Sequence, residues 1–208
     1  MTNPTRQSYR PSERICHAIS AAFMPLLFSF YVFLALAFST GSAWFYVIIS
    51  FIFGSMIQSI SLLLYGRLSR KDVNIDDRKD RPALFAIAIF SYFLGFVALR
   101  LFSAPFIFSG LMFAYVCNTA LAAVITKYLT KVSIHSWGIA GPSVAILYSF
   151  GVFPFLLVLV VGLVVGSTRV KLGYHTWAQV ALSFLAAVPF TWLILYIVPL
   201  AVPIIFRS

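Results

Sequence analysis

Acidic residues are scarce in this chain of 208 residues, with 5 Asp and Glu against 15 Lys and Arg. They are confined to Glu13 and the run from Asp72 to Asp80. The 3 histidines and the 2 cysteines, Cys16 and Cys117, complete the set of possible metal ligands and form no metal-binding motif. We therefore expect no metal and no cofactor. We expect both cysteines to be packing residues within apolar segments.

The composition is that of a membrane protein. Hydrophobic residues make up 62% of the chain and charged residues only 10%, and the mean hydropathy is +0.99. Soluble domains are about 45–50% apolar, and a soluble fold could not hide so much apolar surface. We predict a single integral membrane domain over residues 1–208, in an inner or plasma membrane. The net charge of +10 falls in short loops, so we expect no nucleic-acid partner.

Seven apolar segments are candidates for membrane-spanning helices, since a span takes about 20 apolar residues. They are 15–38, 43–65, 83–101, 104–125, 136–148, 152–167 and 176–206. The first follows basic residues like a signal peptide but is too long for a signal core, so we assign it as a helix. The last contains three prolines, which predict a kink or an early end. We predict an all-α, polytopic transmembrane bundle of six or seven helices.

The basic residues gather in alternate loops. The polar segments 1–14, 66–82, 126–135 and 167–175 fall on one side of this arrangement and carry 13 of the 15 basic residues. The positive-inside rule places that side in the cytoplasm. Three loops on it, 66–82, 126–138 and 167–179, hold the residues suited to phosphate chemistry. We therefore expect an active site on the cytoplasmic face.

The first two loops combine cations with helix starts. Lys79 and Arg81 precede Pro82, which suits the first turn of a helix. Ser133 and His135, after Lys131, stand at another helix start, where free backbone N–H groups favour an anion. Taken alone, the first loop is also typical of a solvated, salt-rich loop. Taken alone, His135 is also typical of an interfacial histidine.

The third loop carries Arg169, His175 and Gln179. An arginine binds phosphate by a two-pronged contact, and a histidine acts as a nucleophile or a proton donor. On a helix that begins near His175, Gln179 lies one turn further on the same face. Arg169 alone would also suit a topology anchor. Because all three loops share one side, the joint pattern favours phosphate chemistry.

The order of a basic Arg-Pro loop, a Ser-x-His helix start and an Arg-x5-His helix start resembles the phosphatidic acid phosphatase type 2 superfamily of membrane lipid phosphate phosphatases, and in particular a bacterial or archaeal subgroup. The resemblance covers about 76–179, and 126–179 carries most of it. It implies metal-independent hydrolysis of a phosphatidate-like lipid or a polyprenyl mono- or diphosphate. His175 would be the nucleophile that forms a phosphohistidine, and His135 would protonate the leaving lipid oxygen. The residues that would hold the phosphoryl oxygens are Arg81, Arg169, Lys79, Ser133 and Lys131.

The chain departs from the superfamily's pattern at three positions. Asn74 stands where a lysine is usual, Val132 replaces a proline, and Gln179 replaces the aspartate that stabilises a histidine cation. One alternative is therefore a non-enzymatic protein that binds lipid phosphate. Another is a magnesium-dependent prenyltransferase that uses the run Asp72 to Asp80, although such enzymes need a second acidic loop.

Overall fold

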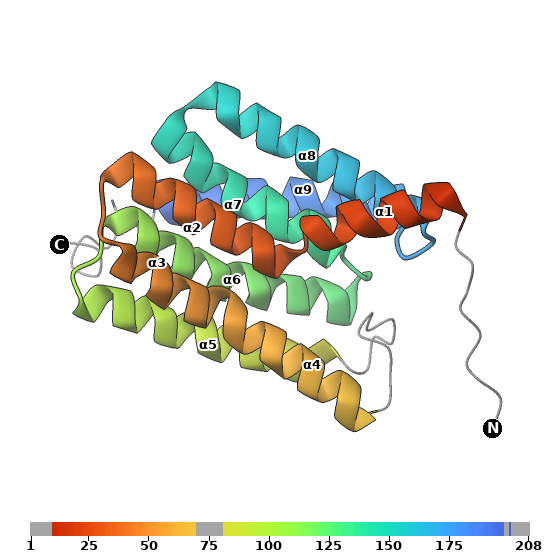
Figure 1. The fold of residues 1–208 in the computed structure, drawn as a ribbon, viewed down its shortest axis with the longest axis horizontal. Helices are drawn as coiled ribbons and strands as arrows, with labels where there is room; N and C mark the ends of the chain where they lie inside the picture. The colour runs from red at the N-terminus through yellow and green to blue at the C-terminus, as the bar shows by residue number, and fades with distance from the viewer. Residues whose placement is uncertain (1–9, 70–80, 198–199, 201–208) are drawn as a thin grey trace.

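The computed structural model describes residues 10–69, 81–197 and 200, and this part of the chain is all-helical (Figure 1). The first half holds α1 (Pro11–Ala22), α2 (Pro25–Thr40), α3 (Trp44–Phe51), the π-helix η1 (Ile52–Met56) and α4 (Ile57–Ser69). The second half holds α5 (Arg81–Leu101), α6 (Phe106–Tyr128), α7 (Ile134–Phe150), α8 (Val152–Lys171), α9 (Trp177–Trp192) and the π-helix η2 (Leu193–Ile197). The prediction of an all-α bundle is confirmed.

Several helices are long and apolar enough to cross a membrane. Among the described residues these are Trp44–Arg67, Pro82–Leu101, Phe106–Tyr128, Val152–Lys171 and Trp177–Tyr196. The bent pair α1 and α2 adds a sixth if it is one span. At 17 residues, α7 is shorter than these. The described residues therefore contain five or six candidate spans. The prediction was six or seven, so the two ranges share only the number six. Large apolar side chains are exposed along the outer faces, as a lipid environment requires.

The first predicted helix, 15–38, is broken in the structure. It ends at Ala22 and restarts at Pro25, with a bend of 48°. Pro25 has no N–H group and occupies the first turn of α2, where none is needed. The break brings Pro25 against α7, because a Cβ added at Gly138 would lie 2.7 Å from the Pro25 Cβ. Only a glycine allows this approach of α2 to α7.

The last predicted helix, 176–206, changes its backbone pattern within the described residues. α9 continues through Pro189, and the backbone changes to a π-helix at Leu193. Because Pro189 cannot donate a backbone hydrogen bond, such an irregular turn is expected close to it. Most of 198–206 lies outside the described residues.

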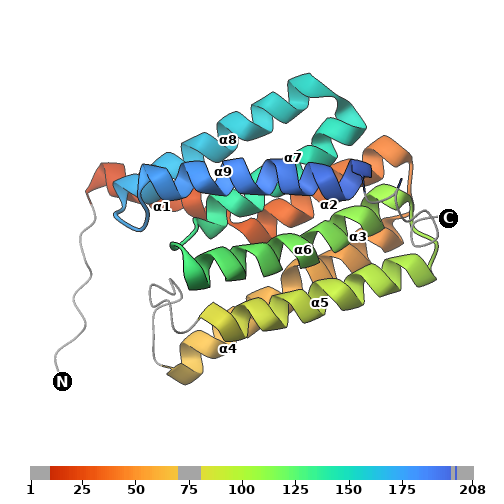
Figure 2. The same ribbon diagram turned by 180° about the vertical axis from the view of Figure 1, so that it is seen from behind.

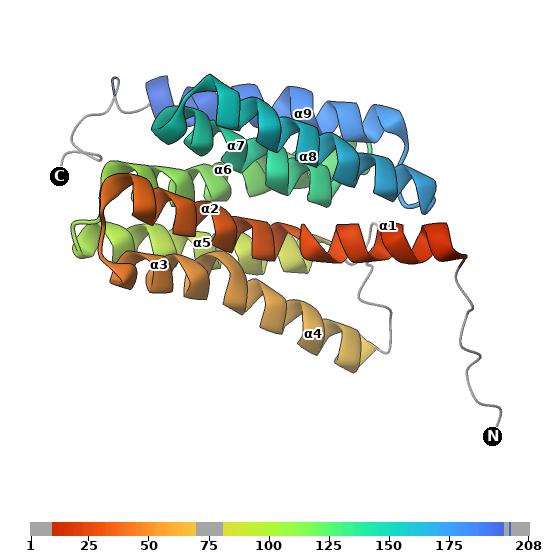
Figure 3. The ribbon, with the colours of Figure 1, turned by 45° about the horizontal axis from the view of Figure 1, so that its top comes forward.

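α7 occupies the middle of the bundle and packs against α2, α8 and α9. In Figure 3, α7, α8 and α9 gather on one side and α3, α4 and α5 on the other, with α2 and α6 between them. From behind, α9 lies along α6 and α7 (Figure 2). The main core includes the fully buried Phe33, Leu36, Phe108 and Leu111.

One end of the bundle collects the chemically rich loops. The starts of α1, α5, α7 and α9 lie there with the ends of α4, α6 and α8 (Figure 1, right). The loops 126–138 and 167–179 therefore meet at this end. Most of the loop 66–82 lies outside the described residues.

Candidate active site

The spacing of Arg169 and His175 is produced by the turn that ends α8. Arg169 lies in the last turn of this helix, and Gly173 follows with a φ of +75°, a value that favours glycine. The backbone N–H groups of Tyr174 and His175 both donate to the Arg169 carbonyl, at 3.0 and 3.3 Å. The chain therefore folds back so that the arginine and the histidine face the same end of the bundle.

Two contacts fix the guanidinium of Arg169, whose side chain is only 7% exposed. Its Nη1 donates to the Ser20 hydroxyl of α1 at 3.0 Å. Its Cζ lies 4.2 Å from the centroid of the Tyr174 ring, which is a cation–π contact. A planar guanidinium held in this way has a fixed orientation, as two-pronged phosphate binding requires.

Gln179 orients the ring of His175. Its Oε1 accepts the backbone N–H of Thr176 at 3.3 Å and lies 3.0 Å from His175 Nδ1. Its Nε2 donates to the Thr130 hydroxyl at 3.3 Å, which fixes the amide orientation. Because Oε1 only accepts, we assign the imidazole proton to Nδ1. Nε2 then keeps its lone pair, as a nucleophile must.

His135 comes from a different segment, the first turn of α7, outside the candidate spans. Burial, then the positive charge of Arg169, and then that of His175 when its ring is protonated, lower its pKa from 6.5 to about 3. Without a bound anion, His135 is therefore neutral at physiological pH.

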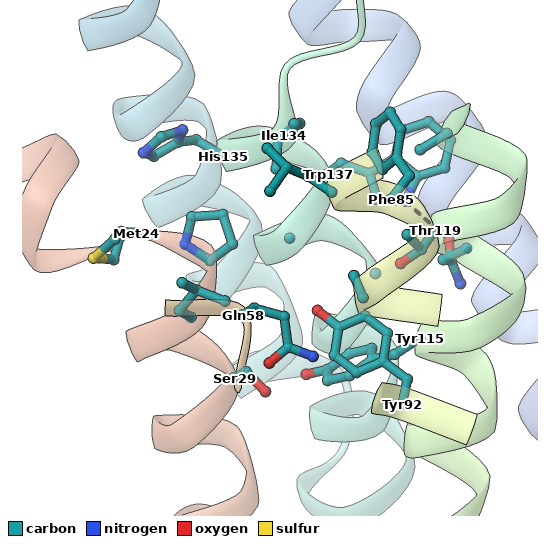
Figure 4. A pocket seen from close by; sticks show the side chains of 18 of the residues that line it. Met24, Ser29, Gln58, Phe85, Tyr92, Tyr115, Thr119, Ile134, His135 and Trp137 are labelled. Atoms are coloured by element: carbon teal, nitrogen blue, oxygen red, sulfur yellow. Dashed lines mark hydrogen bonds between the residues drawn. The ribbon is translucent and has the colours of Figure 1, made fainter. Parts of the chain in front are cut away.

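The side chains of His135, Arg169 and His175 line one cavity of about 270 Å³. Figure 4 shows His135 with other residues of the cavity lining. The cavity runs between α2, α4, α5, α6 and α7, beside the break that precedes Pro25. Apolar side chains form much of its wall, including Leu62, Leu84, Phe85 and Ile87. A largely apolar cavity with a few convergent polar groups is typical of a small-ligand site, and this one suits a lipid chain below a charged headgroup.

Two of the other predicted phosphate ligands, Ser133 and Lys131, do not line this cavity. Ser133 is fully buried and caps α7 by accepting the N–H of Ser136 at 3.4 Å, and it does not line the cavity. Lys131 is half-buried and also lies outside the cavity lining. Lys79 lies outside the described residues. Arg81 begins α5, but its side chain also lies outside what the structure describes.

Three positioning residues were not predicted from the sequence. Ser20 contacts Arg169 from 149 residues away, and no local pattern signals such a contact. Thr130 ties Gln179 to the second loop. Tyr174 stands directly before His175. The presence of this aromatic residue near Arg169 was the one signal in the sequence that could have indicated their cation–π contact.

No three His, Cys, Asp or Glu side chains come together as a possible metal site in the described ranges. The run Asp72 to Asp80, on which the prenyltransferase alternative depends, lies outside those ranges. No protein-family model, curated protein or solved structure matches this chain.

Proposed function

We propose that the protein hydrolyses a lipid phosphate through a phosphohistidine intermediate and without a metal. One observation carries the proposal: His135, Arg169 and His175 line one cavity at the end of an apolar helical bundle. Phosphoryl transfer depends on positioning and on cationic stabilisation of the phosphoryl oxygens, and this group of side chains suits both tasks. The resemblance of the three loops to the phosphatidic acid phosphatase type 2 superfamily supports the same chemistry.

In the first step, Arg169 holds two phosphoryl oxygens and His175 Nε2 attacks phosphorus. The bond between phosphorus and the lipid oxygen breaks, and its electron pair stays on that oxygen. Protonated His135 donates its proton there, so a lipid alcohol leaves. The Gln179 oxygen accepts a hydrogen bond from the Nδ1–H group of His175 and orients the positively charged ring that results.

In the second step, a water molecule attacks the phosphohistidine. Neutral His135 takes a proton from the water as the new P–O bond forms. The P–N bond breaks, its electrons return to His175 Nε2, and inorganic phosphate leaves. Both histidines end in the states in which they began.

The lowered pKa of His135 is consistent with this cycle. A phosphate dianion near His135 opposes the effects of burial and of Arg169. Its negative charge favours the imidazolium, so the pKa rises when the substrate binds. Substrate binding would then load the proton that the leaving oxygen needs.

The cavity suggests how the substrate is held. Its apolar wall suits a lipid chain, and phosphatidate-like lipids and polyprenyl phosphates both carry one. Such a substrate would enter from the bilayer with its headgroup at Arg169. By the positive-inside rule, this end of the bundle faces the cytoplasm.

One observation favours a second candidate, a protein that binds lipid phosphate without hydrolysing it. Gln179 brings no negative charge to His175, so the imidazolium of the intermediate is less stabilised than beside a carboxylate. A labelled lipid phosphate separates the two candidates. Binding without any acid-labile label on the wild-type protein supports the second.

The main experiment measures phosphate release by the purified protein from several lipid phosphates in the presence of EDTA. We expect turnover with chelator, and loss of turnover in His175→Ala and His135→Ala. Lys127→Ala is the matched control, because Lys127 lies in the last turn of α6 and its side chain is not part of the cavity lining. Loss of wild-type activity on chelation would overturn the metal-independent mechanism.

A further inference from the structure

The cavity continues beyond the histidines to a second group of polar side chains, which we call the deep polar cluster: Ser29, Gln58, Tyr92 and Tyr115. All four line the cavity, at its end away from His135 (Figure 4). They come from four elements: α2, α4, α5 and α6. Polar groups within the apolar part of a membrane bundle are costly and usually functional.

Helix geometry gives the depth of this cluster below the catalytic groups. Gly138 lies three residues after His135 on α7, or about 4.5 Å along the axis. Pro25 contacts Gly138, and Ser29 lies four residues further along α2, or about 6 Å. The deep polar cluster therefore begins about 10 Å from His135.

Three atoms of the cluster are buried without a hydrogen-bond partner among the described residues: Ser29 Oγ, Gln58 Oε1 and Tyr115 OH. Ser29 is 4% exposed and Gln58 is 8% exposed. The Tyr115 hydroxyl interacts with the Ser29 hydroxyl, although the pair lacks normal hydrogen-bond geometry. Buried polar groups usually have partners, so Gln58 Oε1, which is buried without one, points to a polar ligand group in the cavity.

The orientation of Gln58 defines the chemistry of that group. Its Nε2 donates to the Phe53 carbonyl at 2.7 Å, and Ser91 Oγ donates to the same carbonyl at 2.8 Å. Phe53 lies in η1, and π-helical turns are frequent at functional sites. Because a carbonyl only accepts, the amide nitrogen must face it, and Oε1 remains as the acceptor.

The cluster therefore offers one fixed acceptor beside two hydroxyls that donate or accept. A ligand hydroxyl satisfies both kinds of group, since it donates to Gln58 Oε1 and accepts from Tyr115. An ester carbonyl cannot donate, and a hydrocarbon does neither. We propose that the deep polar cluster is a subsite for a hydroxyl group on the chain of the lipid substrate, about 10 Å from its phosphate.

This inference rests on the proposed function for the position of the phosphate. An extended chain of single bonds advances about 1.2 Å a bond, so 10 Å corresponds to about eight bonds. Counting from phosphorus through the ester oxygen, the eighth bond reaches carbon 7. The test compounds are dodecyl phosphate, 7-hydroxydodecyl phosphate and, as a positional control, 3-hydroxydodecyl phosphate.

Two quantities are measured for each lipid. The first is phosphate release by the wild type. The second is binding of the lipid to His175→Ala, measured by competition among the three lipids. We expect the 7-hydroxy lipid to bind about tenfold more tightly than the other two and to have a kcat/KM about tenfold higher. Gln58→Leu and Tyr115→Phe should remove this preference. Ser59→Ala is the matched control, because Ser59 bonds to the Ser55 carbonyl and does not line the cavity.

The outcomes separate this inference from the proposed function. Equal hydrolysis of all three lipids overturns the subsite and leaves hydrolysis standing. Preferred binding of the 7-hydroxy lipid without phosphate release supports the subsite and overturns hydrolysis. Absence of binding overturns both. If Gln58→Leu does not fold, Tyr115→Phe and the wild-type comparison still decide.

Discussion

His175 Nδ1 lies 3.0 Å from Gln179 Oε1, and the same oxygen accepts the N–H of Thr176 that opens α9. The residue that orients the proposed nucleophile is therefore also part of a helix cap. Because a glutamine is neutral, it fixes the tautomer of His175 without adding charge. This contact allows the contributions of orientation and charge to be separated by mutation.

Gln179→Leu should remove the orientation, and Gln179→Glu should keep the acceptor and add a negative charge. We expect phosphate release to fall by about 100-fold in the leucine variant, since a histidine in the wrong tautomer loses more than this in related chemistry. The glutamate variant should match or exceed the wild-type kcat. A leucine variant with wild-type kcat would show that this contact is not needed. Thermal unfolding of each variant separates this effect from loss of the helix cap.

Arg169→Lys tests the planar fork of the guanidinium. The substitution keeps the positive charge but loses the two-pronged geometry and the full stacking on Tyr174. We expect KM to rise by about tenfold, because one charge-assisted hydrogen bond is lost. Arg169→Ala should lower kcat/KM further. Equal kinetic constants for wild type and Arg169→Lys would contradict a two-pronged contact.

The pKa of His135 predicts that anion binding takes up a proton. The pKa is about 3 without an anion, and a bound dianion raises it. Affinity for sulfate, whose charge stays constant above pH 4, should therefore increase as the pH falls through the pKa of the complex. The measurement is a sulfate titration at each pH from 8 to 5. In His135→Gln this dependence of the sulfate affinity on pH should disappear. If the affinity of the variant still rises with falling pH as steeply as that of the wild type, another group takes up the proton.

Gly173→Ala should loosen the turn that sets the spacing of Arg169 and His175. The φ of +75° is strained for alanine, and nothing lies within 4 Å of the added Cβ, so the cost is conformational and about 1–2 kcal/mol. We expect a similar loss of stability and a fall in kcat. Gly41→Ala is the matched control, with a φ of +61° and open space at the opposite end of the bundle. Gly41→Ala should lose stability, but its kcat per folded molecule should not change.

The sequence predicted those parts of the structure that depend on local periodicity. Length and hydropathy were sufficient to locate the main apolar helical segments. The contact of His175 with Gln179 followed from a spacing of four residues on a helix start. The break before Pro25 was missed because the apolar run is continuous there and gives no change in hydropathy.

Contacts between distant segments could not be predicted in the same way. Ser20 and Arg169 are 149 residues apart, and a serine in an apolar helix gives no sign of its partner. Gln58 likewise looks like an isolated amide within a candidate span. Only the fold shows that it lines the same cavity as Ser29 and Tyr115. Ser133 matched a helix-start pattern, but its hydroxyl serves the cap itself.

The two hydrogen bonds from the Tyr174 and His175 N–H groups to the Arg169 carbonyl couple these residues to each other in bilayers of different thickness. Membrane helices tilt when the thickness of the surrounding bilayer changes. Arg169 and the backbone of His175 would tilt together, so the distance between them should be insensitive to lipid length. His135 begins a separate helix, and its distance from the other two residues is the one that a thinner or thicker bilayer would alter.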